Sequence, residues 1–205
     1  MITVEEARKY YAGADAAHDF DHVLRVLALA ERIGRAEGAD MEVLRAAVLL
    51  HDVARAEEER TGVCHAKAGA QRAREILAGH PPRKVEAVAE AIAAHRFRDE
   101  VTPRSLEAKV LYDADKLDSI GAIGVARAYA LAGKHGQRLW APVPPDYNGE
   151  DADPNEHTPV HEFVFKLSRL KDTLFTATAW RIAEGRHRYM VAFFQRLERE
   201  VRGEL

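Results

Sequence analysis

The sequence predicts an all-α fold, and three observations lead to this prediction. Ala, Leu, Arg and Glu dominate the 205 residues, whereas alternating strand-like runs of Val, Ile and Thr are scarce. Several windows repeat their apolar residues at helical intervals of three and four positions. Gly and Pro residues separate these windows. We therefore expect a helical, bundle-like domain.

The length suits one domain over residues 1–205, with a helical core at about 16–132, a loop at 133–160 and C-terminal helices at 161–205. The formal net charge of -3 argues against a nucleic-acid-binding protein and favours small anionic substrates. The single cysteine, Cys64, excludes an internal disulfide. The N-terminus does not resemble a signal peptide, and no apolar run approaches the roughly 20 residues of a membrane helix. We expect a soluble cytoplasmic protein without a membrane partner.

Two helices are expected before residue 52. From about residue 16, the residues His22, Val26 and Ile33 recur on one face, and Gly38 ends the helix. The next helix begins near Asp40 and brings His51 to its end, on an apolar face. Both histidines are therefore expected to enter the core.

Further helices are expected at about 65–77, at 83–95 and within the long segment 105–131. Residues 133–160 contain five prolines and three glycines, which is incompatible with a regular helix. A segment of this length is usually a functional lid or a disordered insert, and we favour a mobile lid. A helical stripe over 163–177 and a last helix around 189–201 complete the chain.

The pair His51-Asp52 follows the apolar run Ala46–Leu50, with His22 upstream and Asp115 downstream. Two imidazoles and two carboxylates neutralise a dication without thiols and leave coordination positions for water and substrate. A lone histidine or aspartate on a helix is more often structural. Here three separate helices direct such groups inward, and burying them without a cation would be costly. We therefore predict that His22, His51, Asp52 and Asp115 bind a divalent metal ion.

This H…HD…D series resembles the HD superfamily of metal-dependent phosphohydrolases. Longer stretches resemble its bacterial YedJ/YpgQ-like branch, over nearly the whole chain except the loop. These stretches are 22–26, 49–55, 65–70, 92–97, 106–111, 113–127, 165–173 and 183–188. Where the branch tends to have His-Phe-Tyr-Glu-Lys-Leu, this chain has Glu162-Phe-Val-Phe-Lys-Leu167, a position where a substrate contact could differ.

The resemblance implies an all-helical fold and cleavage of nucleoside triphosphates to monophosphate and pyrophosphate, by attack of a metal-bound water on phosphorus. Manganese is the ion that it implies, and Mg, Fe, Co, Ni and Zn tolerate the same ligands. The expected partner is a small nucleotide substrate. Apolar helix faces near the C-terminus could also support a homodimer.

Other residues could complete the site. In binuclear members of the superfamily, histidines from the region of His65 and His95 bind a second metal, although here they could equally donate to phosphate oxygens. Asp118 shares a helix face with Asp115 and is a candidate, with Asp52, for a catalytic role, since it could orient or deprotonate the water. Its alternative is a salt bridge to an arginine. The basic residues expected to bind substrate are Arg25, Arg55 and Lys116.

Two other functions stay open at this point. A nucleotidase or a phosphodiesterase, acting on cyclic nucleotides or alarmones, would use the same metal core and would differ in its products. A noncatalytic helical signalling or scaffold module would keep the fold without the ligands. The intact ligand series argues against this module.

Overall fold

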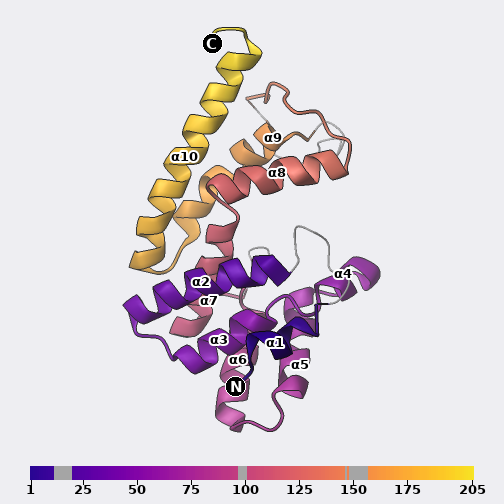
Figure 1. Ribbon diagram of the computed structural model, residues 1–205, viewed down its shortest axis with the longest axis vertical. Helices are drawn as coiled ribbons and strands as arrows, with labels where there is room; N and C mark the ends of the chain where they lie inside the picture. Colours follow the sequence, from indigo (N-terminus) through magenta and orange to yellow (C-terminus); the bar gives the residue numbers. More distant parts are fainter. Residues whose placement is uncertain (12–19, 97–100, 146, 148–156) are drawn as a thin grey trace. The chain divides into compact units, whose positions relative to one another are not determined.

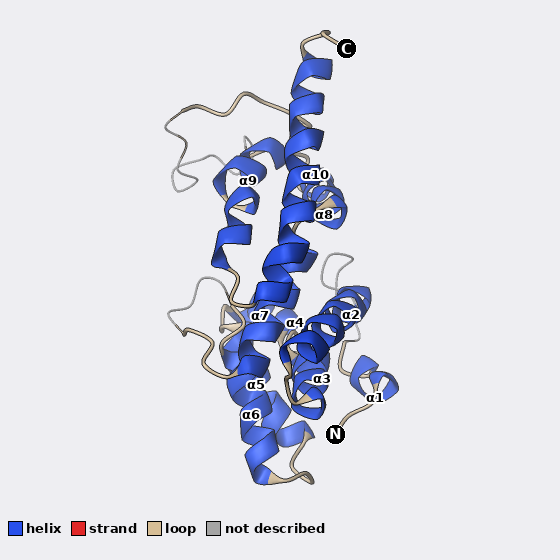
Figure 2. Ribbon diagram, turned by 90° about the vertical axis from the view of Figure 1, so that its left-hand side faces the viewer, coloured by secondary structure: helices blue, strands red, loops and turns tan. Residues whose placement is uncertain are grey.

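The structure is a computed structural model that describes residues 1–11, 20–96, 101–145, 147 and 157–205. Within these ranges it contains ten α-helices, one 3-10 helix and no β-strand (Figures 1 and 2). The all-α prediction is therefore confirmed. None of the helices described combines the length and the hydropathy that crossing a membrane requires.

The helices follow one another along the chain as α1 (Val4–Arg8), α2 (Phe20–Glu37), α3 (Met41–Leu50), α4 (Arg55–Thr61), α5 (His65–Ile76), α6 (Pro82–Ala93), α7 (Leu106–Asp118), α8 (Ala122–Lys134), α9 (Pro159–Phe165), the 3-10 helix η1 (Leu167–Thr173) and α10 (Ala177–Val201).

The chain forms two compact units. Unit 1 consists of Met1–Asp115 together with Phe175–Ala179, and unit 2 consists of Lys116–Leu174 together with Trp180–Leu205. The boundaries fall inside α7 and near the start of α10. The single domain expected over residues 1–205 stays a prediction.

Helix α3 is the centre of unit 1, where it contacts α1, α2, α5 and α6. Its side chains from Ala46 to Leu50 are all buried, as expected of a helical segment that is apolar on every side. The carboxylate of Asp40 caps the first turn by accepting hydrogen bonds from the backbone amides of Glu42 and Val43 at 2.9 and 3.2 Å. This packing places the end of α3, and the His51-Asp52 pair that follows it, inside the core.

Helix α2 presents a buried face that includes His22, Val26 and Ile33, as the apolar spacing predicts. It ends where predicted, because Gly38 adopts a φ of +83° and its amide donates to the carbonyl of Gly34 at 2.9 Å. The predicted beginning of this helix at about residue 16 lies outside the described residues.

Helices α1 and α4 were not expected from the sequence, because each is short and lacks an apolar stripe. The long segment 105–131 is interrupted at Gly121, whose φ of +82° separates α7 from α8. Helix α10 begins at Ala177, earlier than expected. Of the predicted loop 133–160, residues 146 and 148–156 lie outside the described part of the chain.

The stripe over 163–177 is not a single α-helix, and this prediction was wrong. Helix α9 ends at Phe165, and the chain then winds as η1, in which the Arg169 amide donates to the Lys166 carbonyl at 3.0 Å. A 3-10 helix has about 3.0 residues per turn, so an apolar spacing of three serves it as well as an α-helix. Leu167 and Leu170 are accordingly both buried.

A short segment from late in the chain completes unit 1. The carboxylate of Asp113 on α7 accepts hydrogen bonds from the amides of Phe175 and Thr176 at 2.9 and 2.8 Å, and from the Thr176 hydroxyl at 2.6 Å. The carboxylate of Glu37 at the end of α2 accepts from the Thr178 amide at 2.8 Å. The first turn of α10 is thereby attached to α7 and α2.

Candidate metal centre

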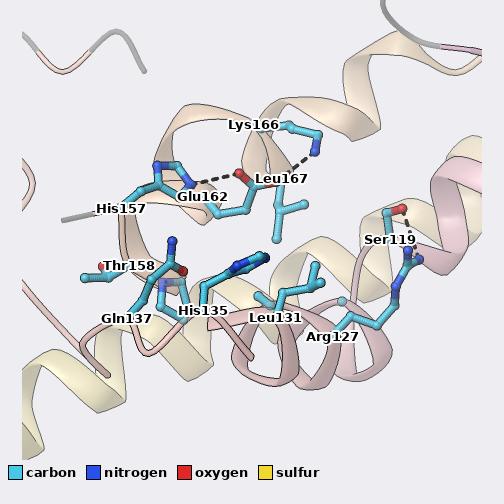
Figure 3. A pocket seen from close by; sticks show the side chains of 13 residues that line it. Ser119, Arg127, Leu131, His135, Gln137, His157, Thr158, Glu162, Lys166 and Leu167 are labelled. Atoms are coloured by element: carbon cyan, nitrogen blue, oxygen red, sulfur yellow. Dashed lines mark hydrogen bonds and ion pairs between the residues drawn. The ribbon is translucent and has the colours of Figure 1, made fainter. Parts of the chain in front are cut away.

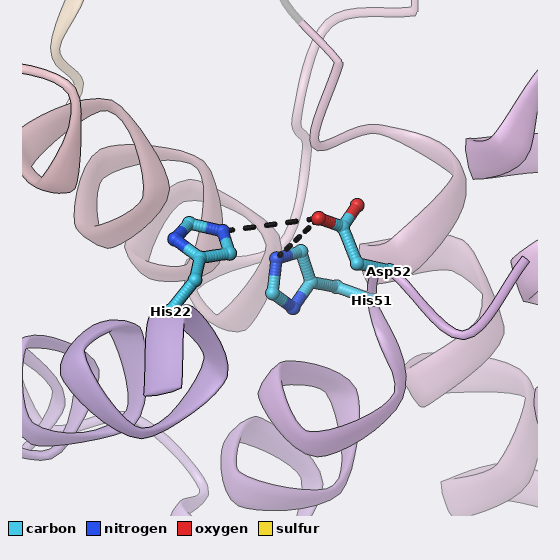
Figure 4. Close-up of side chains that lie close together, drawn as sticks. All are labelled: His22, His51 and Asp52. Atoms are coloured by element: carbon cyan, nitrogen blue, oxygen red, sulfur yellow. Dashed lines mark ion pairs between the residues drawn. The ribbon is translucent and has the colours of Figure 1, made fainter. Parts of the chain in front are cut away.

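Three of the predicted ligands converge inside unit 1 (Figure 4). His22 comes from the first turn of α2, His51 caps the C-terminus of α3, and Asp52 follows in the next turn. Oδ2 of Asp52 lies 3.8 Å from Nε2 of His22 and 3.7 Å from Nε2 of His51. All three residues are at most 6% exposed. They could hold one metal ion between them.

Asp115, the fourth predicted ligand, approaches this group from α7. Its Oδ1 lies 3.4 Å from Nε2 of His22. Two atoms bound to one ion at about 2.0–2.2 Å, at tetrahedral to octahedral angles, are about 2.8–3.6 Å apart. The separations of 3.4, 3.7 and 3.8 Å reach slightly beyond this range. Small rotations of the side chains of His22, His51 and Asp52 would bring these three groups onto one ion, and the place of Asp115 among the ligands stays a prediction.

The imidazole of His51 is oriented so that one ring nitrogen could bind a metal ion. Its Nδ1 donates to the Val48 carbonyl at 2.8 Å, which leaves the lone pair on Nε2. This Nε2 is buried and finds no hydrogen-bond partner in the part of the chain that the structure describes. Burial also lowers the pKa of His51, which favours the neutral ring. A buried lone pair without a donor is costly, and a cation satisfies it.

Asp52 also faces a second pair of histidines. Its other oxygen, Oδ1, lies 3.4 Å from Nε2 of His65 at the start of α5 and 3.7 Å from Nε2 of His95 after α6. Nδ1 of His95 donates a hydrogen bond to the Ile92 carbonyl at 2.6 Å. The lone pair of this ring is therefore on Nε2, as in His51. Asp52, His65 and His95 thus form a second group able to hold an ion. One carboxylate is shared by both groups.

The pKa values of the buried groups favour the protonation states that bind a metal ion. Burial alone would raise the pKa of Asp52, but His51 and His95 outweigh this effect and hold the pKa well below its ordinary value. Burial, followed by the proximity of His95, lowers the pKa of His65 to about 4. At neutral pH His51 and His65 are therefore neutral and Asp52 is ionised, which are the forms that bind metals.

Glu58 on α4 contacts the site, although no pattern in the sequence predicted it. Its Oε2 accepts a hydrogen bond from Nδ1 of His65 at 2.8 Å. The same carboxylate pairs with Nη1 of Arg55 at 3.3 Å and Nη1 of Arg96 at 3.0 Å. A carboxylate in this position orients a metal-binding histidine and directs the free lone pair of the ring toward the metal. The only signal in the sequence is an acidic residue seven positions before His65, which is too common to single out.

The remaining predicted residues lie in several places. Arg55 begins α4, where its Nη1 is 3.1 Å from Nδ1 of His65, and Arg25 is half-buried on α2. Lys116 and Asp118 belong to unit 2. Asp118 is buried, and its Oδ2 pairs with Nη1 of Arg127 at 3.4 Å, which is the salt bridge considered as its alternative role. Its catalytic role stays a prediction.

Buried imidazoles and carboxylates that converge from several helices define a class of all-α metal-binding protein. Comparison with known proteins identifies the class more closely. The profile of the HD domain family matches residues 19–120. The chain is also 33% identical over 192 residues to the YpgQ protein of Bacillus subtilis, covering 92% of this chain and 86% of that protein. The chain belongs to the HD domain family, and at the level of that family it is a metal-dependent phosphohydrolase.

Solved structures show the same relationship. A crystal structure of Bacillus subtilis YpgQ in complex with ADP is 28% identical, has a TM-score of 0.74, and is aligned over 97% of this chain and 98% of that chain. An HD-superfamily hydrolase from Bacillus thuringiensis is 30% identical with a TM-score of 0.76, over 97% of this chain and 94% of that chain. A predicted HD superfamily hydrolase from an uncultured Thermotogales bacterium is 31% identical with a TM-score of 0.68, over 96% of this chain and 90% of that chain.

Proposed function

We propose that the protein hydrolyses nucleotides, and specifically that it cleaves nucleoside triphosphates to the monophosphate and pyrophosphate. The observation that carries the proposal is the position of Asp52, whose two oxygens face two separate pairs of buried histidines. The ADP in the YpgQ structure supports a nucleotide as the substrate, because that protein resembles this chain over almost its full length.

The nitrogen and oxygen atoms that face one another in the site suggest two sets of metal ligands. His22, His51, Asp52 and Asp115 would hold one divalent ion, and Asp52, His65 and His95 a second. Manganese is the proposed ion, and Mg, Fe, Co, Ni and Zn suit the same nitrogen and oxygen atoms. When bound, such an ion supplies a water of lowered pKa and polarises a phosphoryl oxygen.

The protein's own groups would orient the ligands and the substrate. The carbonyls of Val48 and Ile92 fix the rings of His51 and His95, and Glu58 fixes His65. Arg55, whose side chain is 30% exposed, is the proposed contact for a phosphate oxygen.

Arg25 and Lys116 are further proposed phosphate contacts, and Asp118 is proposed to orient or deprotonate the attacking water. In this assignment the cationic groups bind the phosphates, and Asp118 aligns the water with the phosphorus.

The experiment strips the protein with a chelator, reloads it with Mn²⁺ and incubates it with a panel of nucleotides. Nucleoside triphosphates should yield monophosphate and pyrophosphate, and Asp52→Ala should abolish this yield. Asp21→Ala, an exposed aspartate beside His22 on α2, is the matched control and should keep the activity. Inactivity toward every nucleotide with the metal bound would refute the proposal.

The products also separate the other functions. Inorganic phosphate from monophosphates would indicate a nucleotidase, and a linear product from a cyclic nucleotide would indicate a phosphodiesterase. A folded protein that binds no metal in elemental analysis would indicate a scaffold. The cytoplasmic location and the homodimer stay predictions.

A further inference from the structure

Unit 2 contains a cavity of about 250 Å³ between α8 and α9, and none of the residues that line it belongs to the metal centre (Figure 3). One wall is a face of α8 on which Gly124, Ala128 and Leu131 recur at helical spacing. The other wall is formed by α9 and the residues next to it, including Glu162 and Leu167. The cavity is therefore a separate feature of the molecule.

The cavity is apolar in its middle and polar at its two ends. Figure 3 shows Leu131 and Leu167 between two groups of polar side chains, with Arg127 and Ser119 on one side and Glu162 and His157 on the other. A ligand that fits must therefore have an apolar body and polar groups at its edges.

The carboxylate of Glu162 is held in a fixed position. Its Oε1 accepts from Nζ of Lys166 at 2.8 Å, and its Oε2 accepts from Nε2 of His157 at 3.1 Å. Nδ1 of His157 in turn interacts with the hydroxyl of Tyr147. Burial raises the pKa of Glu162, but Lys166 and His157 outweigh it, so the pKa is lowered and the group is ionised. Each carboxylate oxygen has a second lone pair, and these can accept from N–H groups of a ligand.

Arg127 supplies donors at the other end. Its contacts with Asp118 and Ser119, at 3.4–3.5 Å, involve Nη1. A guanidinium also carries donors on Nη2 and Nε, which can bind ligand acceptors.

The two cationic side chains of the lining, Arg127 and Lys166, are each paired with a carboxylate, although Asp118 lies outside the lining. Arg127 faces the carboxylate of Asp118, and Lys166 faces that of Glu162. A triphosphate would need a surplus of cations, as phosphate sites have. A neutral ligand with both donors and acceptors matches this lining better.

We propose that this cavity binds the heterocyclic base of a nucleoside. A base is neutral and planar, and its edges carry both N–H donors and ring or carbonyl acceptors. Arginine pairs with purine acceptors and a carboxylate accepts from amino groups. The volume of 250 Å³ lies below the roughly 300–1,000 Å³ of pockets for drug-sized ligands, which fits a base but not a whole triphosphate. The inference goes beyond the proposed hydrolysis, because this binding needs no metal.

The experiment titrates the full-length protein, in the presence of a chelator, with adenosine, guanosine, cytidine, uridine and ribose by calorimetry. Saturable binding of at least one nucleoside is expected, and ribose should not bind. Ala128→Leu fills the cavity from α8 and should weaken binding at least about tenfold. Ala126→Leu places the same side chain on the exposed face of the same helix and should leave the affinity unchanged. Circular dichroism verifies that both variants are folded.

A second variant keeps the test decisive if Ala128→Leu fails to fold. Glu162→Gln preserves the shape of the side chain and should weaken nucleoside binding roughly tenfold to a hundredfold, since a charged acceptor is lost. Absence of nucleoside binding overturns the inference, and so does binding that neither cavity variant alters. Hydrolysis by the metal-loaded protein is measured separately, so failure of the proposed function and failure of this inference are distinguishable.

Discussion

Glu58 and His65 are joined by a hydrogen bond of 2.8 Å between the carboxylate Oε2 and the ring Nδ1. The opposite nitrogen of the ring, Nε2, lies 3.4 Å from Asp52 and 3.1 Å from Nε2 of His95. The carboxylate therefore selects the tautomer in which the lone pair of His65 faces the other two ligands. Helix α4, which supplies none of the predicted ligands, thus orients one histidine of the second group.

Glu58→Gln should weaken metal binding by His65, Asp52 and His95. The amide is a poorer acceptor than the carboxylate, and loss of such a partner typically costs ten- to a hundredfold in metal affinity. Equilibrium dialysis against Mn²⁺ with elemental analysis measures the change. Glu57→Gln on the same helix is the matched control and should bind as the unmodified protein does. Equal affinity of the two variants would contradict the role of Glu58.

Asp113→Ala should destabilise the protein without removing a metal ligand. The substitution leaves two backbone amides and the Thr176 hydroxyl without their buried acceptor. We expect a loss of roughly 2–4 kcal/mol in the free energy of unfolding, measured by urea denaturation of the metal-free protein. Asp172→Ala, at an exposed aspartate, should change it by less than about 0.5 kcal/mol. A similar urea midpoint for both variants would show that the hydrogen bonds of Asp113 contribute little to the free energy of unfolding.

Gly69→Val should disturb the metal centre through the backbone. A Cβ atom at Gly69 would lie 3.3 Å from the His51 carbonyl oxygen and 3.4 Å from Cγ2 of Ile92, and valine adds two more methyl groups. Overpacking of this kind costs about 1–3 kcal/mol and shifts the backbone, so the affinity for Mn²⁺ should also fall. Gly185→Val is the control, because a Cβ there meets nothing within 4 Å. Unchanged stability and metal affinity in Gly69→Val would mean that α5 can move away freely.

The metal-free protein should lose stability in acid through His65. Burial, together with His95, lowers the pKa of this residue to about 4 in the folded state, whereas the unfolded chain has a pKa of about 6.5. Between these pH values the unfolded state binds more protons than the folded state. The contribution of His65 to the free energy of unfolding is therefore fully present above about pH 6.5 and is lost as the pH falls toward 4. The loss is on the order of 3 kcal/mol.

Urea denaturation of the chelated protein at several pH values measures this loss. His65→Asn should have a shallower dependence, because it lacks the titrating ring. A flat profile for the unmodified protein over this range would argue against a neutral, buried His65.

Much of the fold follows from local patterns. The apolar run before His51 predicted a buried helix, and Gly38 predicted where the preceding helix ends. Both features depend on neighbouring residues and so can be read from the sequence. The likeness to the HD superfamily added the all-helical fold, which the structure confirms.

Other features depend on contacts between distant residues. Glu58 lies on a polar helix with no periodic signal, so its contact with His65 appears only in three dimensions. The division of Asp52 between two pairs of histidines also requires the packing of α2, α3, α5 and α6. The η1 segment was misassigned because a spacing of three does not distinguish an α-helix from a 3-10 helix.

The attachment of Thr176 to Asp113 has a consequence for synthesis. Every predicted metal ligand precedes residue 116, yet residues 175–179 are part of the same compact unit. Because the ribosome makes the chain from its N-terminus, the histidines emerge early, and about sixty more residues must follow Asp113 before it can meet its partners. A nascent chain arrested before Thr176 would hold its ligands in an unfinished unit, open to proteases and to premature metal capture.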